Sequence, residues 1–316
     1  MNQIKYLFAI AIAAIILTSC NNDKMYEGEM YKNIFSLLSS GSFNIRELEH
    51  DLDKVDEPAY IAVSVGGTTP GKQEIVIQLI EDTQPFDLYN FTNFVFESQY
   101  ARLLPKRNYK FDGMALKIPV GEKSATLPFQ INMDRLSPDS TYFISLKVQE
   151  FSHGEINPQK ADVLYRPRMF NFWAQTRIAT NYRLRGKYNN ADIVGSKRVF
   201  PLAHNRVRTT MGNTTNFNAD TVRINRESII IEIGEKTRGE KIVLGKKYPV
   251  KVMPFRLGTI LPPLTEDPEF PNIFFIEDDG YRTFKTFLLH YRFQRHGEAT
   301  IHVMKEELRL EFLIQK

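Results

Sequence analysis

The chain has 316 residues, of which 42% are hydrophobic, and it carries a formal net charge of +4 at pH 7. This length is sufficient for two domains that each bury an apolar core. Cys20 is the only cysteine, which excludes an internal disulfide, a thiolate zinc site and a cysteine nucleophile. The fold must therefore rest on its apolar core.

The first residues have the pattern of a targeting segment. Lys5 supplies a positive charge, and residues 6–17 form an uninterrupted apolar run. A membrane-spanning helix needs roughly 20 such residues, so this shorter run is typical of a signal peptide. The segment ends in Leu17-Thr18-Ser19-Cys20, with two small residues before the cysteine. This motif resembles the lipobox of bacterial lipoproteins.

The lipobox resemblance implies that residues 1–19 are removed and that the sulfur of Cys20 is alkylated by diacylglycerol. Membrane lipid is then a partner of the protein, because several acyl chains, such as palmitate, give stable attachment. The following Asn21-Asn22-Asp23-Lys24 is a diluted form of the acidic export signal of surface lipoproteins in Bacteroidetes. We therefore expect an outer-membrane location, and we favour an outward-facing orientation over a periplasm-facing one.

Alternating hydrophobicity dominates the rest of the chain, and helical periodicity is scarce. In the last of the alternating segments, Phe287, Leu289, Tyr291 and Phe293 fall on one face of a predicted strand. Short β-branched or alternating runs separated by Gly, Pro and Asn turns are typical of sandwiches and barrels. The sequence therefore predicts an all-β protein. Further strands are predicted at residues 60–65, 74–80, 124–133, 141–149 and 228–233.

A domain boundary is expected between residues 166 and 180, where one alternating stretch ends and another begins. The charge also changes there, because residues 20–175 are net acidic and residues 176–316 are net basic. No low-complexity linker separates the two halves, so we expect the domains to pack against each other. The predicted organisation is a signal peptide (1–19), a tether (20–30), an N-terminal sandwich (31–172) and a C-terminal β domain (173–316).

Two stretches resemble domains of unknown function that occur together on Bacteroidetes lipoproteins. The first domain also precedes some surface endoglycosidases and glycan-binding proteins. The resemblance implies an immunoglobulin-like N-terminal sandwich, and a C-terminal domain that is either a second sandwich or a calycin-like barrel. It also implies a Sus-like setting, in which outer-membrane machinery captures and imports glycans. The resemblance is carried by Val65-Gly66-Gly67, residues 75–80, Tyr89-Asn90, Leu103-Leu104-Pro105, Tyr109, Ile118, Gly121, Ile156-Asn157-Pro158, Tyr165, residues 182–188 and Val199-Phe200-Pro201-Leu202.

The sequence contains no recognised catalytic grouping. Its histidines form no HExxH motif, and neither a G-x-S-x-G elbow nor a phosphate-binding glycine loop is present. We therefore predict a protein without catalytic residues or a cofactor, and we keep a hydrolase with unrecognised carboxylates as an alternative. Asp278 and Asp279 form a weak candidate calcium site, for which a solvated turn is an equally good explanation.

Aromatic and cationic side chains are the candidates for ligand binding. Alternation separates Trp173 from Phe170 and Phe172, and we favour a buried plug between the domains over a sugar-binding face. Tyr188 and Tyr281 are loop candidates. Arg183 and Arg185 are candidates within the basic second half. A solvated face without a dedicated ligand is the default interpretation of this half, and an acidic glycan, lipopolysaccharide phosphates and the acidic first domain are the alternatives.

Two short motifs resemble the O-glycosylation acceptors of Bacteroidetes. They are Asp139-Ser140-Thr141 and Asp220-Thr221-Val222, which make Ser140 and Thr221 the candidate acceptors.

The leading functional hypothesis is a lipid-anchored, non-catalytic protein that binds glycans or assists their uptake. Its expected partners are membrane lipid, a poly- or oligosaccharide that can be acidic, and an outer-membrane Sus-like transporter complex. Nucleic acid is not expected as a partner of an exported protein. A structural, adhesin or fimbrial role is the second hypothesis.

Overall fold

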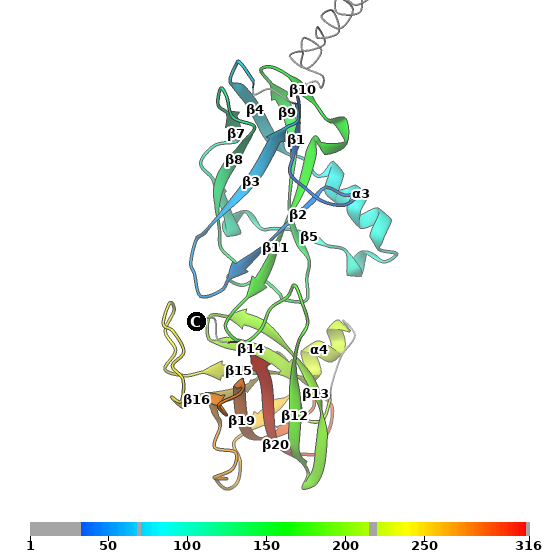
Figure 1. Cartoon of the computed structure of the whole chain (residues 1–316). Coiled ribbons are helices and arrows are strands. Elements are labelled where there is room, and N and C mark those ends of the chain that lie inside the picture. Colours follow the sequence, from blue (N-terminus) through cyan, green and yellow to red (C-terminus); the bar gives the residue numbers. More distant parts are fainter. Residues whose placement is uncertain (1–32, 68–70, 215–219, 314–316) are drawn as a thin grey trace, which may run out of the picture.

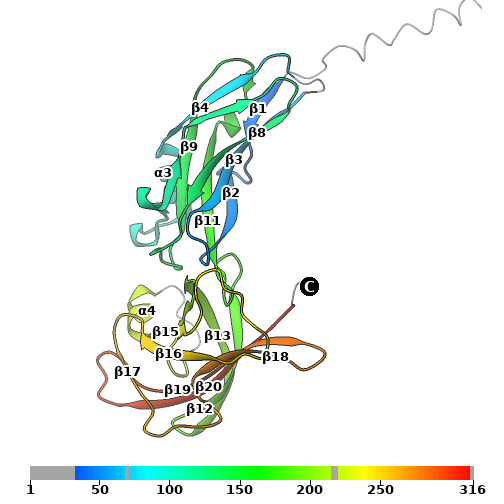
Figure 2. The ribbon, with the colours of Figure 1, turned by 90° about the vertical axis from the view of Figure 1, so that its left-hand side faces the viewer.

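The structure is a computed structural model and describes residues 33–67, 71–214 and 220–313. Two β domains follow each other along the long axis of an elongated molecule, and β11 runs from the first toward the second (Figures 1 and 2). The predicted signal peptide, the predicted tether and Cys20 lie outside the described residues. No helix of the described residues is long and apolar enough to span a membrane.

The N-terminal domain is a sandwich of two sheets. Across the described residues, one sheet has the strand order β10-β1-β3-β8-β6, and the other has the order β2-β11-β9-β4-β7, with β5 paired to β9. Most pairs are antiparallel, whereas the pairs β1–β10, β2–β11 and β5–β9 are parallel. The strands are β1 (Ile34–Leu37), β2 (Ile45–Asp51), β3 (Glu57–Val65), β4 (Ile75–Glu81), β5 (Arg102–Leu103), β6 (Tyr109–Phe111), β7 (Ala115–Ile118), β8 (Ser124–Ile131), β9 (Tyr142–Phe151), β10 (Glu155–Ile156) and β11 (Asp162–Phe170).

The sandwich core follows from the period-two pattern of its strands. In β4, Ile75, Ile77 and Leu79 are buried while the residues between them are more exposed. Strands β3, β8 and β9 supply matching apolar rows, and together these side chains form one cluster between the sheets. The predicted all-β fold with an N-terminal immunoglobulin-like sandwich is confirmed.

One helix of the sandwich was not anticipated from the sequence. Helix α3 (Gln84–Asn93) has a proline in its first turn and buries Phe86 and Tyr89. These rings pack against Phe143 of β9 and Leu164 of β11. Because Leu88 and Phe91 are apolar but exposed, the apolar residues do not gather on one face, and the segment lacks the 3.6-residue period that marks an amphipathic helix. Three short 3-10 helices, η1 (Glu97–Gln99), η2 (Lys106–Asn108) and η3 (Pro158–Lys160), complete the described helical turns of this domain.

The C-terminal domain is a closed barrel, which decides between the two predicted alternatives. Within the described residues, eight antiparallel strands run in the order β12-β13-β14-β15-β16-β18-β19-β20, and β20 pairs with both β19 and β12 to close the ring. Strand β17 pairs with the C-terminal end of β19. The elements are β12 (Thr180–Tyr188), β13 (Ala191–Ala203), β14 (Arg206–Thr210), α4 (Thr221–Glu227), β15 (Ser228–Ile233), β16 (Tyr248–Pro254), β17 (Thr259–Leu261), β18 (Ile273–Asp278), β19 (Thr283–Gln294) and β20 (His302–Phe312).

The barrel interior is filled with side chains. As predicted, Phe287, Leu289, Tyr291 and Phe293 of β19 share one face, and all are almost completely buried in the barrel core. Gly212 is required beside them, because its φ is +59° and an added Cβ would lie 2.3 Å from the ring of Phe293.

A buried polar network crosses this interior. The Nζ of Lys197 lies 2.5 Å from the carboxylate of Glu306, and neither side chain has any exposed surface. The hydroxyl of Tyr291 donates to the other oxygen of Glu306 at 2.8 Å, and the backbone N–H of Gly212 donates to that hydroxyl at 3.1 Å. Burial lowers the pKa of Lys197, and attraction to Glu306 opposes that shift.

Candidate functional site

Asn171 makes four hydrogen bonds in the segment that joins the two domains. The Oδ1 of Asn171 accepts the backbone N–H groups of Trp173 and Ala174 at 3.0 and 2.9 Å. Its Nδ2 donates to the carbonyls of Ala203 and Arg206 in the barrel at 2.8 and 3.1 Å. One buried side chain therefore both shapes the connecting turn and ties it to the barrel.

Trp173 is inserted from this turn into the barrel core. It is 1% exposed and packs edge-to-face on Phe172 and Phe274, with ring centroids 5.6 and 5.7 Å apart. Its backbone carbonyl accepts the hydroxyl of Tyr182 at 3.0 Å. Its Nε1 is buried without a hydrogen-bond partner among the described residues. The indole is therefore buried, as favoured from the sequence, but it packs within the barrel core and not between the two domains.

Lys285 lies beside this indole in an unusual setting. Its Nζ donates to the carbonyl of Phe172 and lies 4.2 and 4.7 Å from the ring centroids of Phe172 and Phe312. The ammonium group is therefore held between two aromatic faces. Burial lowers the pKa of Lys285 to about 8, because the charged form loses its water without gaining a carboxylate.

Two open cavities meet at this point, of about 420 and 540 Å³. We call them together the junction groove. They share Phe170, Phe172 and Phe312, and their volumes are within the range of small-ligand sites. The first is also lined by Glu49, Asn171, Trp173, Ala174, Gln175, Thr180, Lys285 and Leu310, and the second by Asp51, Asp53, His204, Lys236, Gly239, Glu240, Lys241, Ile242 and Leu313.

Carboxylates from the edge strand β2 form the sandwich side of the groove. Glu49 lies 3.2 Å from the guanidinium of Arg177, which leaves its second oxygen without a hydrogen bond among the described residues. Burial raises the pKa of Asp51, and its Oδ1 accepts the backbone N–H of Asp53. The groove thus combines aromatic faces with carboxylates, a lysine and the side chain of Gln175, which is a set of groups that can both stack on and hydrogen-bond a ligand.

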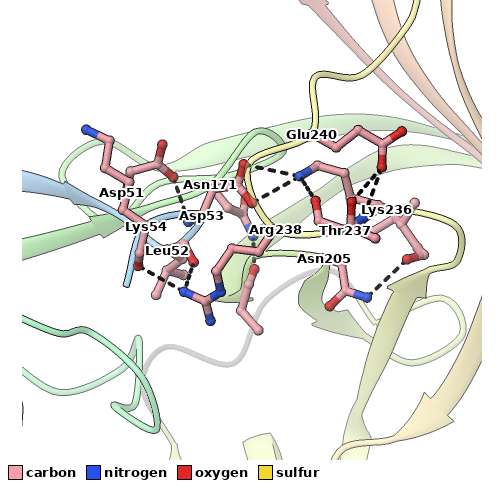
Figure 3. A network of polar contacts seen from close by, with 12 residues as sticks. Asp51, Leu52, Asp53, Lys54, Asn171, Asn205, Lys236, Thr237, Arg238 and Glu240 are labelled. Carbon is pink, nitrogen blue, oxygen red and sulfur yellow. Dashed lines mark hydrogen bonds and ion pairs between the residues drawn. The ribbon is translucent and has the colours of Figure 1, made fainter. Parts of the chain in front are cut away.

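The loop between β15 and β16 clamps the barrel to the sandwich (Figure 3). Lys236 lies 3.0 and 3.1 Å from the two carboxylate oxygens of Asp53 and is itself only 6% exposed. Arg238 donates to the carbonyls of Leu52 and Lys54 at 3.1 and 2.9 Å. It also reaches Asp134 at 3.2 Å. These contacts fix one wall of the groove relative to the other.

A second clamp joins β14 to the turn before β9. The guanidinium of Arg208 forms two hydrogen bonds with Asp139, one of them 2.7 Å long, and lies 4.5 Å over the ring of Phe200. Arg208 is 1% exposed. Of the partners considered for the basic half, the acidic first domain is therefore the one that Arg208, Lys236 and Arg238 contact.

The other predicted ligand-binding residues lie apart from this groove. The hydroxyl of Tyr188 lies 2.8 Å from Nδ1 of His302, and the two rings stack. Arg183 and Arg185 point outward from β12 and are exposed. Tyr281 is 96% exposed at the tip of the β18–β19 hairpin. The structure therefore does not bring these side chains together with Trp173.

The acidic turn at Asp278 and Asp279 and the two candidate O-glycosylation acceptors lie apart from the junction groove. Asp278 and Asp279 each accept backbone N–H groups within the turn, as expected of the solvated-turn explanation. Of the described residues, no group of three or more His, Cys, Asp or Glu is placed to hold a metal ion. Ser140 is half-buried beside the Asp139 clamp, and Thr221 is exposed at the start of α4, after its N-cap Asp220.

The main groove residues that sequence reasoning missed are Lys285, Phe312 and Glu49. A signal existed for Lys285, since it has the same parity on β19 as Phe287 and Leu289 and must therefore face inward. No comparable signal existed for Glu49, because its position depends on how β2 approaches the barrel.

Comparisons with known proteins agree with this architecture. Two family models match the chain, one for an N-terminal domain over residues 26–153 and one for a C-terminal domain over residues 161–309. No curated protein matches it.

Solved structures with the same two-domain arrangement come from Bacteroides. A protein of unknown function from Bacteroides ovatus is 18% identical, with a TM-score of 0.60 and coverage of 92% of this chain and 93% of that chain. An auxiliary nutrient binding protein from Bacteroides thetaiotaomicron is 13% identical, with a TM-score of 0.56 and coverage of 87% and 93%. At these identities the likeness establishes the fold. Since the two family models together span most of the sequence, the chain belongs to the family of two-domain proteins that pair this N-terminal domain with this C-terminal domain.

Proposed function

We propose that the protein is a non-catalytic nutrient-binding protein of the cell envelope that binds a saccharide in the junction groove. The observation that carries this proposal is the placement of Phe172, Phe312 and Lys285 in one cavity of about 420 Å³ that Glu49 of β2 also lines. The C–H faces of a sugar ring pack on aromatic rings. Its hydroxyls need donors and acceptors of the kind that Lys285, Gln175 and Glu49 offer.

The two clamps support a preformed site. Because Arg208 and Lys236 are buried and paired with aspartates of the other domain, the groove walls are held in place before a ligand arrives. A preformed groove spares the ligand the free energy of ordering the two domains. The similarity to an auxiliary nutrient binding protein is consistent with this role.

Binding is tested by calorimetry on the purified full chain with a panel of oligosaccharides built from neutral hexoses, N-acetylhexosamines or uronates. We expect at least one of them to bind, and Lys285→Met to weaken that binding at least about tenfold, or roughly 1.4 kcal/mol. The methionine keeps the apolar contacts with Phe172 and Phe312 and removes the donor. Lys251→Met is the matched control, because Lys251 is exposed on β16 and lines neither cavity.

Two results would contradict the proposal. Equal affinities of the oligosaccharide for the wild type and for Lys285→Met would mean that it does not bind in the junction groove. Release of new reducing ends from any bound oligosaccharide, lost on replacement of Glu49 or Asp51, would make the protein a hydrolase instead.

Attachment through Cys20 is the second part of the proposal. We propose that lipid on this cysteine holds the protein at the outer membrane, facing outward, where it would deliver its saccharide to a Sus-like transporter complex. Cells fed radioactive palmitate should label the wild type and not Cys20→Ser. A protease added to intact cells should cleave the protein if it faces outward and leave it intact if it faces the periplasm. An unlabelled wild-type protein recovered in the soluble fraction would contradict the anchor.

A further inference from the structure

Three cations project in a row from the outer wall of the barrel. On β12 the side chains of Tyr182 and Leu184 are buried inside, so Arg183, Arg185 and Lys187 point outward, and all three are exposed. Residues two apart on a strand are separated by about 6.7 Å, so the three charges repeat at this spacing along a straight line. We call Arg183, Arg185 and Lys187 the β12 cation row.

The row has no ion-pair partner among the described residues, although Asp192 of β13 lies across from Lys187 and Glu307 of β20 lies across from Arg185. None of its three side chains forms a hydrogen bond or an ion pair with another described residue, whereas Lys305 and Arg309 on the neighbouring β20 are paired with Asp267 and Glu277 at 2.6 and 2.9 Å. The row is also distinct from the junction groove, since none of its members lines either cavity.

Like charges face each other between β12 and β20. Arg183 lies directly opposite Arg309, and Lys187 lies directly opposite Lys305, while Arg185 is opposite Glu307. Directly opposite like charges on one face of a sheet are destabilising. An anion bound along β12 would offset that repulsion.

One exposed apolar side chain also borders the row. Val194 on β13 is 80% exposed and lies directly opposite Arg185. Because the barrel is closed, β12 is held by hydrogen bonds to β13 on one side and β20 on the other. The row is therefore a line of charges on a strand whose backbone is held on both sides, beside one exposed apolar side chain that a sugar ring can contact.

We propose that the β12 cation row binds a linear anionic polysaccharide, whose carboxylates or sulfates lie along the strand. A repeating line of charge matches a chain that carries acidic groups at regular intervals. A polysaccharide fits better than an anionic lipid surface, because the sandwich lies between the barrel and the N-terminal end of the described chain (Figures 1 and 2). This surface is independent of the ligand of the junction groove.

The test compares binding of polygalacturonate, sulfated dextran and uncharged dextran to the full chain. We expect the wild type to bind at least one of the two polyanions, with an affinity that falls as salt is raised, and not to bind uncharged dextran. The triple change Arg183→Gln, Arg185→Gln and Lys187→Gln should weaken polyanion binding at least about tenfold. A matched triple change, Lys247→Gln, Lys251→Gln and Arg256→Gln, removes the same net charge from exposed positions elsewhere and should leave binding within about twofold.

Each other outcome overturns the proposal. Equal losses in the two triple variants would mean that net charge alone attracts the polyanion. Row-dependent binding to vesicles that contain phosphatidylglycerol, with no binding to either polyanion, would assign the row to a membrane surface. Lys285→Met should leave polyanion binding unchanged, so failure of the junction groove and failure of the row are measured separately.

Discussion

The sandwich and the barrel each bury a polar cluster, and the two clusters differ in charge. In the sandwich, His50 lies 2.6 Å from the hydroxyl of Tyr165 and 3.1 Å from Glu57, and burial lowers the pKa of His50. Glu57 also lies 2.8 Å from the exposed amine of Lys54, so its charge is shared with the rim of the sheet. In the barrel, Lys197 and Glu306 have no exposed surface at all.

The difference reflects how each domain is closed. The His50 cluster joins the edge strand β2 to the start of β3 and to Tyr165 of β11, and the carboxylate of Glu57 there keeps some exposed surface. The barrel has no such rim around its interior, so a charge there needs an internal partner. Replacing single members of these clusters and clamps is therefore the direct way to test the comparison.

The largest effect is expected inside the barrel. Glu306→Leu leaves Lys197 buried without a partner and should lower the free energy of unfolding by about 3–5 kcal/mol. Urea unfolding followed by the fluorescence of Trp173, the only tryptophan in the chain, measures this loss. The double change Lys197→Met with Glu306→Leu should recover most of it. A double variant as unstable as the single one would mean that the charge pair is not the cause.

A smaller effect is expected from the pH dependence of Lys285. Its pKa of about 8 is below the ordinary value of 10.5, so between these values the unfolded chain binds more protons than the folded one. The unfolding free energy should therefore rise with pH in this window and fall back as pH drops to 8. Relative to Lys285→Met, the wild type should gain about 2–3 kcal/mol between pH 8 and pH 10.5. If the difference in unfolding free energy between the wild type and Lys285→Met did not vary with pH, the lowered pKa of Lys285 would be contradicted.

The clamp between the domains should contribute less. Asp139→Ala leaves the guanidinium of Arg208 without its carboxylate and should cost about 2 kcal/mol, because hydrogen bonds to charged groups contribute roughly 1.5–3 kcal/mol. The control is Glu311→Gln, which removes the exposed partner of Arg282 and should cost less than about 1 kcal/mol. Equal costs at these two positions would show that the clamp does not hold the domains together.

The smallest effect is expected on the outer face of α3. Phe91 is 81% exposed, so Phe91→Ser should change the unfolding free energy by no more than about 0.5 kcal/mol. Phe86→Ser, on the buried face of the same helix, should cost several times more because Phe86 contacts Phe143 and is 8% exposed. Similar losses at both positions would contradict the orientation of the helix.

The sequence predicted those parts of the fold that depend on local alternation. The strands around Ile77 and Phe287 could be predicted from the alternation of residues two apart. The split into two domains could be predicted from the break in that alternation and from the change in net charge. Barrel closure could not, because it depends on the pairing of β20 with β12, which begins more than one hundred positions earlier. Helix α3 was missed because its buried face is limited to Phe86 and Tyr89, together with the amide of Asn90.

The candidate site was predicted only in part. Trp173 was identified because it is a lone tryptophan next to a strand end, and it is buried as expected, although inside the barrel and not between the domains. Lys285 was overlooked because a lysine within a strand is ordinarily solvent-facing. Its inward orientation follows from parity with Phe287 once the strand is extended toward its start.

The most direct test of saccharide binding at the junction uses the fluorescence of Trp173, which lines the groove. During titration of the full chain with the oligosaccharide identified by calorimetry, we expect a saturable change at the calorimetric affinity. The change should weaken in Lys285→Met and persist in Lys251→Met. Calorimetric binding of that oligosaccharide with no change in Trp173 emission, and with equal affinity in Lys285→Met, would place its site elsewhere on the protein.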